Sequence, residues 1–162
     1  MDFGRIVLGK YPNGISPKLL TLAQIFKKAK VQCQITENIT LERFKKLIWN
    51  APFNPLSVLT QGMDTKQILR DPYLKDLVFK IMLEIRSIAH SYGYKTRLDV
   101  IHKHIIDTEK MVAYKPSMML DWQARKSLET DAILGNAIAL AQAKHMPTPY
   151  LDTIFALLQK YS

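Results

Sequence analysis

The longest helical pattern in the sequence follows Asp71-Pro72, and it limits the possible folds more than any other feature. A proline fits the first position of a helix, and Gly93 is placed where a helix would end. Between them, apolar residues recur at the three- and four-residue spacing of an amphipathic helix. They are Leu74, Leu77, Val78, Ile81, Met82, Ile85, Ile88 and Ala89. Such a wide apolar face has to pack against other helices, so the pattern predicts a mainly α-helical bundle.

Residues 38–162 carry further helical patterns, which together predict a bundle of about six helices. The patterns lie at 41–48, 98–105, 133–141 and 149–158, and a further helix is expected to start after Pro116.

The first 37 residues have a different pattern. The run Arg5–Leu8 favours a strand, Ser16-Pro17 favours a helix start, and 31–35 alternates apolar and polar residues as a strand does. A strand–helix–strand unit is too small to form its own core. We therefore expect the edge of a larger sheet in 1–37, with the rest of that sheet outside the chain, and a helical domain in 38–162.

The charge and the cysteine count limit the function classes. A formal net charge of +9 attracts anions of any kind, including nucleic acid, anionic lipid and phosphorylated cofactors. The basic residues are spread along the chain, which favours solvated helix faces. The only cysteine, Cys33, excludes an internal disulfide framework, and no residue spacing indicates a metal site. No apolar run approaches the ~20 residues of a membrane span. We expect a reduced, cytoplasmic compartment and no membrane contact.

Lys46, Asn50 and Asn54 form the densest polar group on an otherwise apolar segment. On a helix, this spacing places them on one slowly drifting stripe, where a cation and two amides could hold a polar anionic ligand. We expect apolar neighbours to bury Lys46 in part and so lower its pKa, as suits an acid catalyst. The alternative is an exposed lysine and two asparagines that end the helix. Pro52 is expected to disturb the stripe, because it removes a helical hydrogen bond.

A second polar group follows Pro116 and contains Ser117, Glu129 and Asp131. Ser117 fits a helix N-cap, and the two acids fit the first turn of the next helix, so none of them requires a functional role. In one straight helix Ser117 and Glu129 would be about 18 Å apart. A turn between them is needed before they can share a site.

Taken in order, the two groups resemble the C-terminal part of the ketopantoate reductase family. The family pattern Lys-x-x-x-Asn-x-x-x-Asn-Pro corresponds to 46–55. Its Ser-Met-x-x-Asp and Glu-x-Asp-x-x-x-Gly segments correspond to 117–121 and 129–135. The opening Gly4–Gly9 is similar to the strand that closes the family's cofactor domain. On this resemblance, 1–37 would be the C-terminal edge of that domain.

The resemblance implies a helical domain like that of 6-phosphogluconate dehydrogenase, which follows a Rossmann domain in the family. It implies reduction of ketopantoate to pantoate with NADPH, in pantothenate biosynthesis. By the motifs, Lys46 would be the general acid and Glu129 would orient the substrate or Lys46. The substrate would be bound by Asn50, Asn54 and Ser117.

Further expectations follow from the same resemblance. NADPH would be bound mainly by the Rossmann domain, which this chain lacks, so the chain alone is expected to be inactive. Its partners would be a 2-oxo acid and that domain, and a homodimer is compatible with the family.

The alternative hypothesis is a non-enzymatic basic helical module that binds nucleic acid or dimerises. The net charge of +9 is its main support. Aromatic residues are not interleaved with the basic ones, and no recognition-helix pattern accompanies the charge. The sequence therefore favours the reductase, and no nucleic-acid partner is expected.

Overall fold

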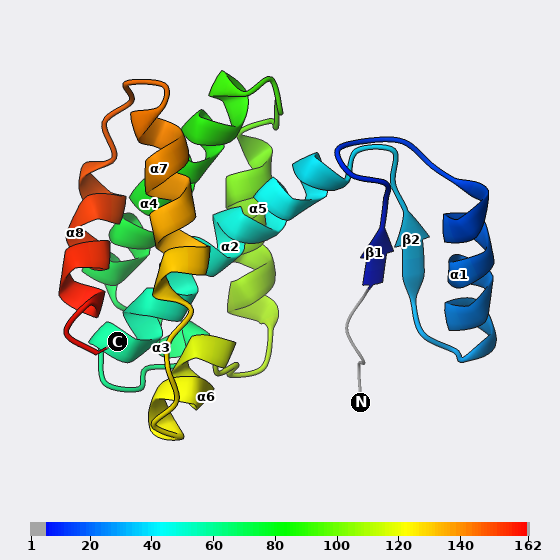
Figure 1. Cartoon of the computed structure of the whole chain (residues 1–162). Coiled ribbons are helices and arrows are strands. Elements are labelled where there is room, and N and C mark those ends of the chain that lie inside the picture. The colour runs from blue at the N-terminus through cyan, green and yellow to red at the C-terminus, as the bar shows by residue number, and fades with distance from the viewer. Residues whose placement is uncertain (1–5, 162) are drawn as a thin grey trace. The chain divides into compact units, whose positions relative to one another are not determined.

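A computed structural model describes residues 6–161, and most of them are helical (Figure 1). The chain divides into two compact units, one ending at Phe44 and the other beginning at Lys45. This boundary falls inside helix α2 (Ile39–Leu59), which therefore contributes to both units.

The first unit contains two strands and a helix, as the sequence predicts. Strands β1 (Ile6–Leu8) and β2 (Cys33–Ile35) pair in parallel, and α1 (Pro17–Lys28) connects them. The predicted strand residue Arg5 lies outside the described residues. Helix α1 starts as expected, because the Ser16 hydroxyl accepts a hydrogen bond from the Leu19 N–H.

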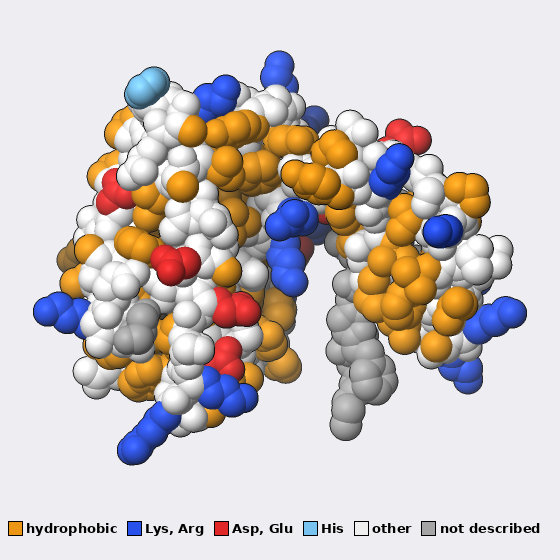
Figure 2. Space-filling view, viewed as in Figure 1, with side chains coloured by type: hydrophobic (Ala, Val, Ile, Leu, Met, Phe, Trp, Pro, Cys, Tyr) orange, Lys and Arg blue, Asp and Glu red, His pale blue; other side chains and the backbone are white. Residues whose placement is uncertain are grey.

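The first unit has little core of its own. Helix α1 contains no buried residue, and Leu20 and Ile25 are 47% and 57% exposed. Figure 2 shows apolar side chains gathered on the visible face of this unit. The turn after β1 is nevertheless tightly packed, since a Cβ on Gly9 would lie 2.8 Å from the Ile39 Cβ. Only glycine fits this close approach.

The second unit is helical throughout. The elements that follow α2 are α3 (Thr65–Arg70), α4 (Pro72–Ser91), α5 (Asp99–Lys110), α6 (Ser117–Gln123), the π-helical turn η1 (Asp131–Gly135), α7 (Asn136–Gln142) and α8 (Pro149–Leu158). The mainly helical fold is thus confirmed. Helix α3, which the sequence patterns did not indicate, has only six residues and begins with a capping box formed by Asp64 and Gln67.

Helix α4 forms the centre of the core, as its pattern predicts. It contacts α3, α5, α7 and α8, and its fully buried face contains Val78, Ile81, Met82, Ile85, Ile88 and Ala89. The Asp71 carboxylate caps its start by accepting from the N–H groups of Tyr73 and Leu74 at 2.9 and 3.0 Å. Gly93 follows its end in a left-handed conformation, with φ +84°.

Helix α2 continues through both of its prolines, Pro52 and Pro55, and ends at Leu59. The hypothesis that Asn50 and Asn54 end the helix is therefore wrong. Residues 51–58 are all buried, so packing on every side holds this segment helical despite the two missing N–H donors. No helix within residues 6–161 is long and apolar enough to cross a membrane.

Candidate functional site

The stripe of Lys46, Asn50 and Asn54 lies on the part of α2 that belongs to the second unit. Lys46 is exposed, Asn50 is half-buried, and Asn54 is only 2% exposed. Successive members are offset by about 40° around the helix, so the stripe passes from the surface into the interior. Its polar groups therefore change from a solvated cation to a buried amide.

The expected burial of Lys46 is wrong for this chain. Sequence neighbours on a helix point about 100° apart, so apolar neighbours need not cover a side chain. Ile48 has no exposed surface, whereas Lys46 points elsewhere and stays exposed.

Asn54 is held by three hydrogen bonds. Its Oδ1 accepts from the Met118 N–H at 3.1 Å and from the Ser117 hydroxyl at 3.3 Å. Its Nδ2 donates to the Asn50 carbonyl at 3.2 Å. The structure therefore brings together Asn54 and Ser117, two of the predicted site residues, although they are far apart in sequence.

Ser117 is the first residue of α6 and not its N-cap, so that expectation is wrong. Pro116 occupies the cap position, and no side chain of the cap forms the usual hydrogen bond. The acceptor for the second helical N–H, that of Met118, comes instead from Asn54 on α2. The Ser117 side chain is free of the capping role and remains exposed beside that contact.

Glu129 lies on a separate segment from Ser117. Helix α6 ends at Gln123, Arg125 turns the chain with φ 54°, and Glu129 follows just before the π-helical turn η1. The chain therefore turns between Ser117 and Glu129, as it must if the two residues are to share a site. Glu129 is exposed, and within residues 6–161 the structure records no side-chain contact that joins it to Lys46 or Ser117.

Aromatic residues lie next to the stripe, and two of them, Trp49 and Phe53, are among the apolar neighbours that the sequence predicts for Lys46. The Trp49 ring is 4.9 Å from that of Phe53 and 5.9 Å from that of Tyr114, between ring centroids. Its Nε1 donates to the Thr108 hydroxyl at 2.9 Å. Tyr114 is 43% exposed and lies on the loop that leads into α6. The position of Trp49 between Lys46 and Asn50 in sequence was the available signal for this apolar wall.

His104 on α5 lies against α2, where it contacts the backbone of Lys45. Burial lowers the pKa of its imidazole, although a backbone hydrogen bond at Lys45 and the charge of Asp107 oppose that effect. The charge of Lys103 acts in the same direction as burial. Its Nε2 is buried and has no hydrogen-bond partner among residues 6–161. The fold therefore favours the neutral ring.

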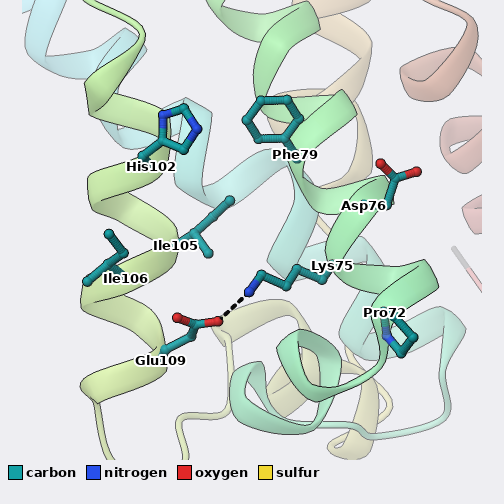
Figure 3. Close-up of a pocket in the computed structure, with 8 residues that line it drawn as sticks. All are labelled: Pro72, Lys75, Asp76, Phe79, His102, Ile105, Ile106 and Glu109. Atoms are coloured by element: carbon teal, nitrogen blue, oxygen red, sulfur yellow. Dashed lines mark hydrogen bonds and ion pairs between the residues drawn. The ribbon is translucent and has the colours of Figure 1, made fainter.

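A groove lies between α4 and α5 (Figure 3). It is lined by Pro72, Lys75, Asp76, Phe79, His102, Ile105, Ile106 and Glu109. The Lys75 ammonium crosses it to reach the Glu109 carboxylate at 2.7 Å. No predicted site residue lines this groove. Figure 2 shows that the basic side chains on the visible face are scattered and do not form one patch. The α2–α6 contact remains the candidate site.

Comparisons with known proteins identify relatives over the whole chain. Residues 38–162 match the family described as ketopantoate reductase PanE/ApbA C terminal. A 2-dehydropantoate 2-reductase from Nostoc sp. is 31% identical over 164 residues, which cover 98% of this chain and 51% of that protein. The crystal structure of 2-dehydropantoate 2-reductase from Methylococcus capsulatus aligns with a TM-score of 0.94 and 41% identity, covering 99% of this chain and 51% of that one.

A more distant structure shows the same fold. D-mandelate dehydrogenase with NADH and anilino(oxo)acetate aligns with a TM-score of 0.88 at 19% identity, covering 98% of this chain and 67% of that one. The chain spans about half the length of the curated relatives it matches. These matches do not favour a basic nucleic-acid-binding module.

Proposed function

The chain belongs to the ketopantoate reductase family, and from this premise we propose that it is the substrate-binding and catalytic part of an NADPH-dependent reductase of ketopantoate. The product would be pantoate, formed in the cytoplasm. The observation that carries the proposal is the contact between Asn54 and Ser117, because it joins the two separate family motifs at one place.

In this proposal Lys46 is the general acid. The carbonyl oxygen of a 2-oxo acid gains negative charge as hydride adds to the neighbouring carbon. An ammonium group aimed at that oxygen stabilises the charge and donates the proton that completes the alcohol. The flexible, exposed side chain of Lys46 can reach a substrate that lies along the stripe.

Asn50 and Ser117 would hold the polar ends of the substrate. Within residues 6–161 the structure records no hydrogen bond of the Asn50 side-chain amide, so its donors and acceptor are available to a ligand. The exposed Ser117 hydroxyl would donate to the carboxylate. Glu129 would orient the substrate or Lys46 by accepting a hydrogen bond. Asn54 is the third residue of the substrate-binding group, with Asn50 and Ser117.

The reduced nicotinamide supplies the hydride when the cofactor is bound. In residues 6–161 no glycine-rich turn leads directly from a strand into a helix, since residues 9–16 separate β1 from α1. Residues 9–16 do not fit a dinucleotide cradle. We assign the cofactor to a Rossmann domain of the same protein, and expect the 162-residue chain alone to be inactive. A Staphylococcus aureus ketopantoate reductase of the same fold is dimeric, and we extend self-association to this protein.

The test of Lys46 is steady-state NADPH oxidation by the full-length enzyme with ketopantoate. Lys46→Ala should lower kcat at least ~100-fold, because proton transfer is lost. Arg43→Ala removes an exposed cation one turn earlier on α2 and should leave kcat unchanged. A Lys46→Ala enzyme within a few-fold of wild type would show that Lys46 is not the general acid.

A further inference from the structure

Helix α6 begins without a cap of its own. The first N–H groups of any helix have no partner within it, and a side-chain acceptor at the N-cap normally satisfies one of them. Pro116 stands at that position and offers none. The Met118 N–H is bound instead by Asn54 Oδ1 at 3.1 Å, from a position 64 residues away in sequence. Helix α6 is thus capped by α2.

The direction of the Asn54 amide follows from its partners. A backbone N–H can only donate, so the atom that faces Met118 has to be the oxygen. Its two lone pairs accept from Met118 and Ser117, while Nδ2 on the other side donates to the Asn50 carbonyl. With these three bonds and 2% exposure, Asn54 has little surface left for a ligand.

The two bonds to the Asn54 oxygen differ in quality. The Met118 N–H bond at 3.1 Å has an ordinary length, whereas 3.3 Å is long for a hydroxyl donor. A hydroxyl rotates about its C–O bond, so the Ser117 proton can turn to a ligand at little cost. The cap on Met118 stays in place when it does.

We propose that Asn54 is a positioning residue that acts through Ser117: it fixes the start of α6 against α2, so that the Ser117 hydroxyl lies at the inner end of the Lys46–Asn50 stripe. The inference rests on the proposed function, in which Ser117 binds the substrate carboxylate. In this inference Asn54 does not contact the substrate directly; it aligns the two motifs with each other.

The start of α8 is also capped by a side chain from another helix, which provides a matched control. Thr148 at the N-cap of α8 forms no capping bond, and the Glu84 carboxylate on α4 accepts from the N–H groups of Tyr150 and Leu151 at 3.0 and 2.8 Å. Within residues 6–161, the recorded hydrogen bonds of the Glu84 side chain go to α8 and to none of the predicted site residues. Removing it takes away a cap of the same kind and leaves the α2–α6 contact intact.

The cap itself is tested by amide hydrogen exchange in the 162-residue chain. With the Ile85 amide in the α4 core as the reference for global opening, Asn54→Ala should speed exchange at Met118 at least ~10-fold, because the acceptor on Asn54 is lost. Glu84→Ala should speed exchange at Leu151 and not at Met118. Asn54→Asp keeps an acceptor oxygen for Met118 and should retain protection there, although its second oxygen faces the Asn50 carbonyl and should lower overall stability. If Asn54→Ala does not fold, Asn54→Ser, whose hydroxyl is too short to reach Met118 and can bond within α2, should show the same faster exchange at Met118. Unchanged Met118 exchange in Asn54→Ala would overturn the cap.

The positioning role is tested by a double-mutant cycle in the full-length enzyme. Asn54→Ala and Ser117→Ala should each raise KM for ketopantoate by about 10-fold with kcat changed only a few-fold. The double variant should be no worse than the poorer single variant, because Asn54 acts through Ser117. Glu84→Ala should lower the melting temperature and leave KM unchanged.

The outcomes separate this inference from the function on which it rests. Effects on KM that multiply in the double variant would mean that Asn54 contacts the substrate independently, and the inference would be wrong. A KM effect of Ser117→Ala without one for Asn54→Ala would overturn it as well. If Ser117→Ala leaves KM unchanged, the proposed carboxylate-binding role fails, whatever the exchange data show of the cap.

Discussion

The carboxylate of Glu84 gives a quantitative test of how this bundle is held together. It is half-buried on α4 and accepts two backbone N–H bonds from the start of α8, at 3.0 and 2.8 Å. Removing a helix cap typically costs about 1 kcal/mol, and hydrogen bonds to a charged group about 1.5–3 kcal/mol. Because the site is partly solvated, we expect Glu84→Ala to lower the free energy of unfolding by about 1–2 kcal/mol.

The assay is urea unfolding of the 162-residue chain at neutral pH, followed by circular dichroism. The control is Glu109→Ala, which removes an exposed carboxylate paired with Lys75 and should cost less than about 1 kcal/mol. If the two variants lose equal stability, the capping bonds contribute no more than a surface ion pair. The account of α8 would then be wrong.

The pH dependence of the same group has a definite sign. Burial raises the pKa of the Glu84 carboxyl above its ordinary value of 4.5, and the charge of Asp152 adds to this, while the bonds to Tyr150 and Leu151 lower it. The native state therefore holds this proton more tightly than the unfolded chain does. Just above pH 4.5, this group makes stability fall as pH rises. The fall should be absent in Glu84→Gln, and an identical pH profile for the two proteins would contradict the assignment.

Two further predictions concern other helices. Burial is the main cause that lowers the pKa of His104 in the folded chain, so the unfolded chain binds the proton more readily. The free energy of unfolding should therefore decrease as pH falls through and below 6.5. In urea unfolding, His104→Gln should show a smaller decrease. A profile that does not depend on His104 would exclude it as the titrating group. A Cβ on Gly135 would lie 3.0 Å from Asp131 Oδ1 and 3.4 Å from Phe155 Cε2. Gly135 has helical backbone angles, and the exposed Asp131 side chain can turn away, so Gly135→Ala should leave the free energy of unfolding unchanged or raise it by up to about 1 kcal/mol. A melting temperature well below that of the wild type would show that η1 cannot accommodate the added Cβ.

The sequence predicts the elements whose signals are local. The apolar face of α4 and the Asp71-Pro72 and Ser16-Pro17 helix starts are readable because periodicity and capping act within a few residues. Helix α3 was missed because six residues carry too little periodicity, although Asp64 and Gln67 supply a capping box. The π-helical turn η1 has no sequence signature of its own.

The candidate site was only partly predictable for the same reason. The spacing of Lys46, Asn50 and Asn54 correctly indicated a helical stripe, but not how deep each side chain lies. The burial of Asn54 and the capping of α6 depend on how α2 packs against a segment 64 residues further along the chain. Spacing within either motif does not encode such a contact, and only the resemblance of both motifs to one family placed them together.

On the proposed function, this chain supplies the substrate-binding residues of a ketopantoate-reducing enzyme. The most direct measurement is the rate of NADPH oxidation by the full-length protein, with and without ketopantoate, compared with the rate for the 162-residue chain alone. We expect oxidation that depends on ketopantoate in the full-length protein and none above background in the chain. A full-length, folded protein that binds NADPH but oxidises it no faster with ketopantoate than without would contradict it.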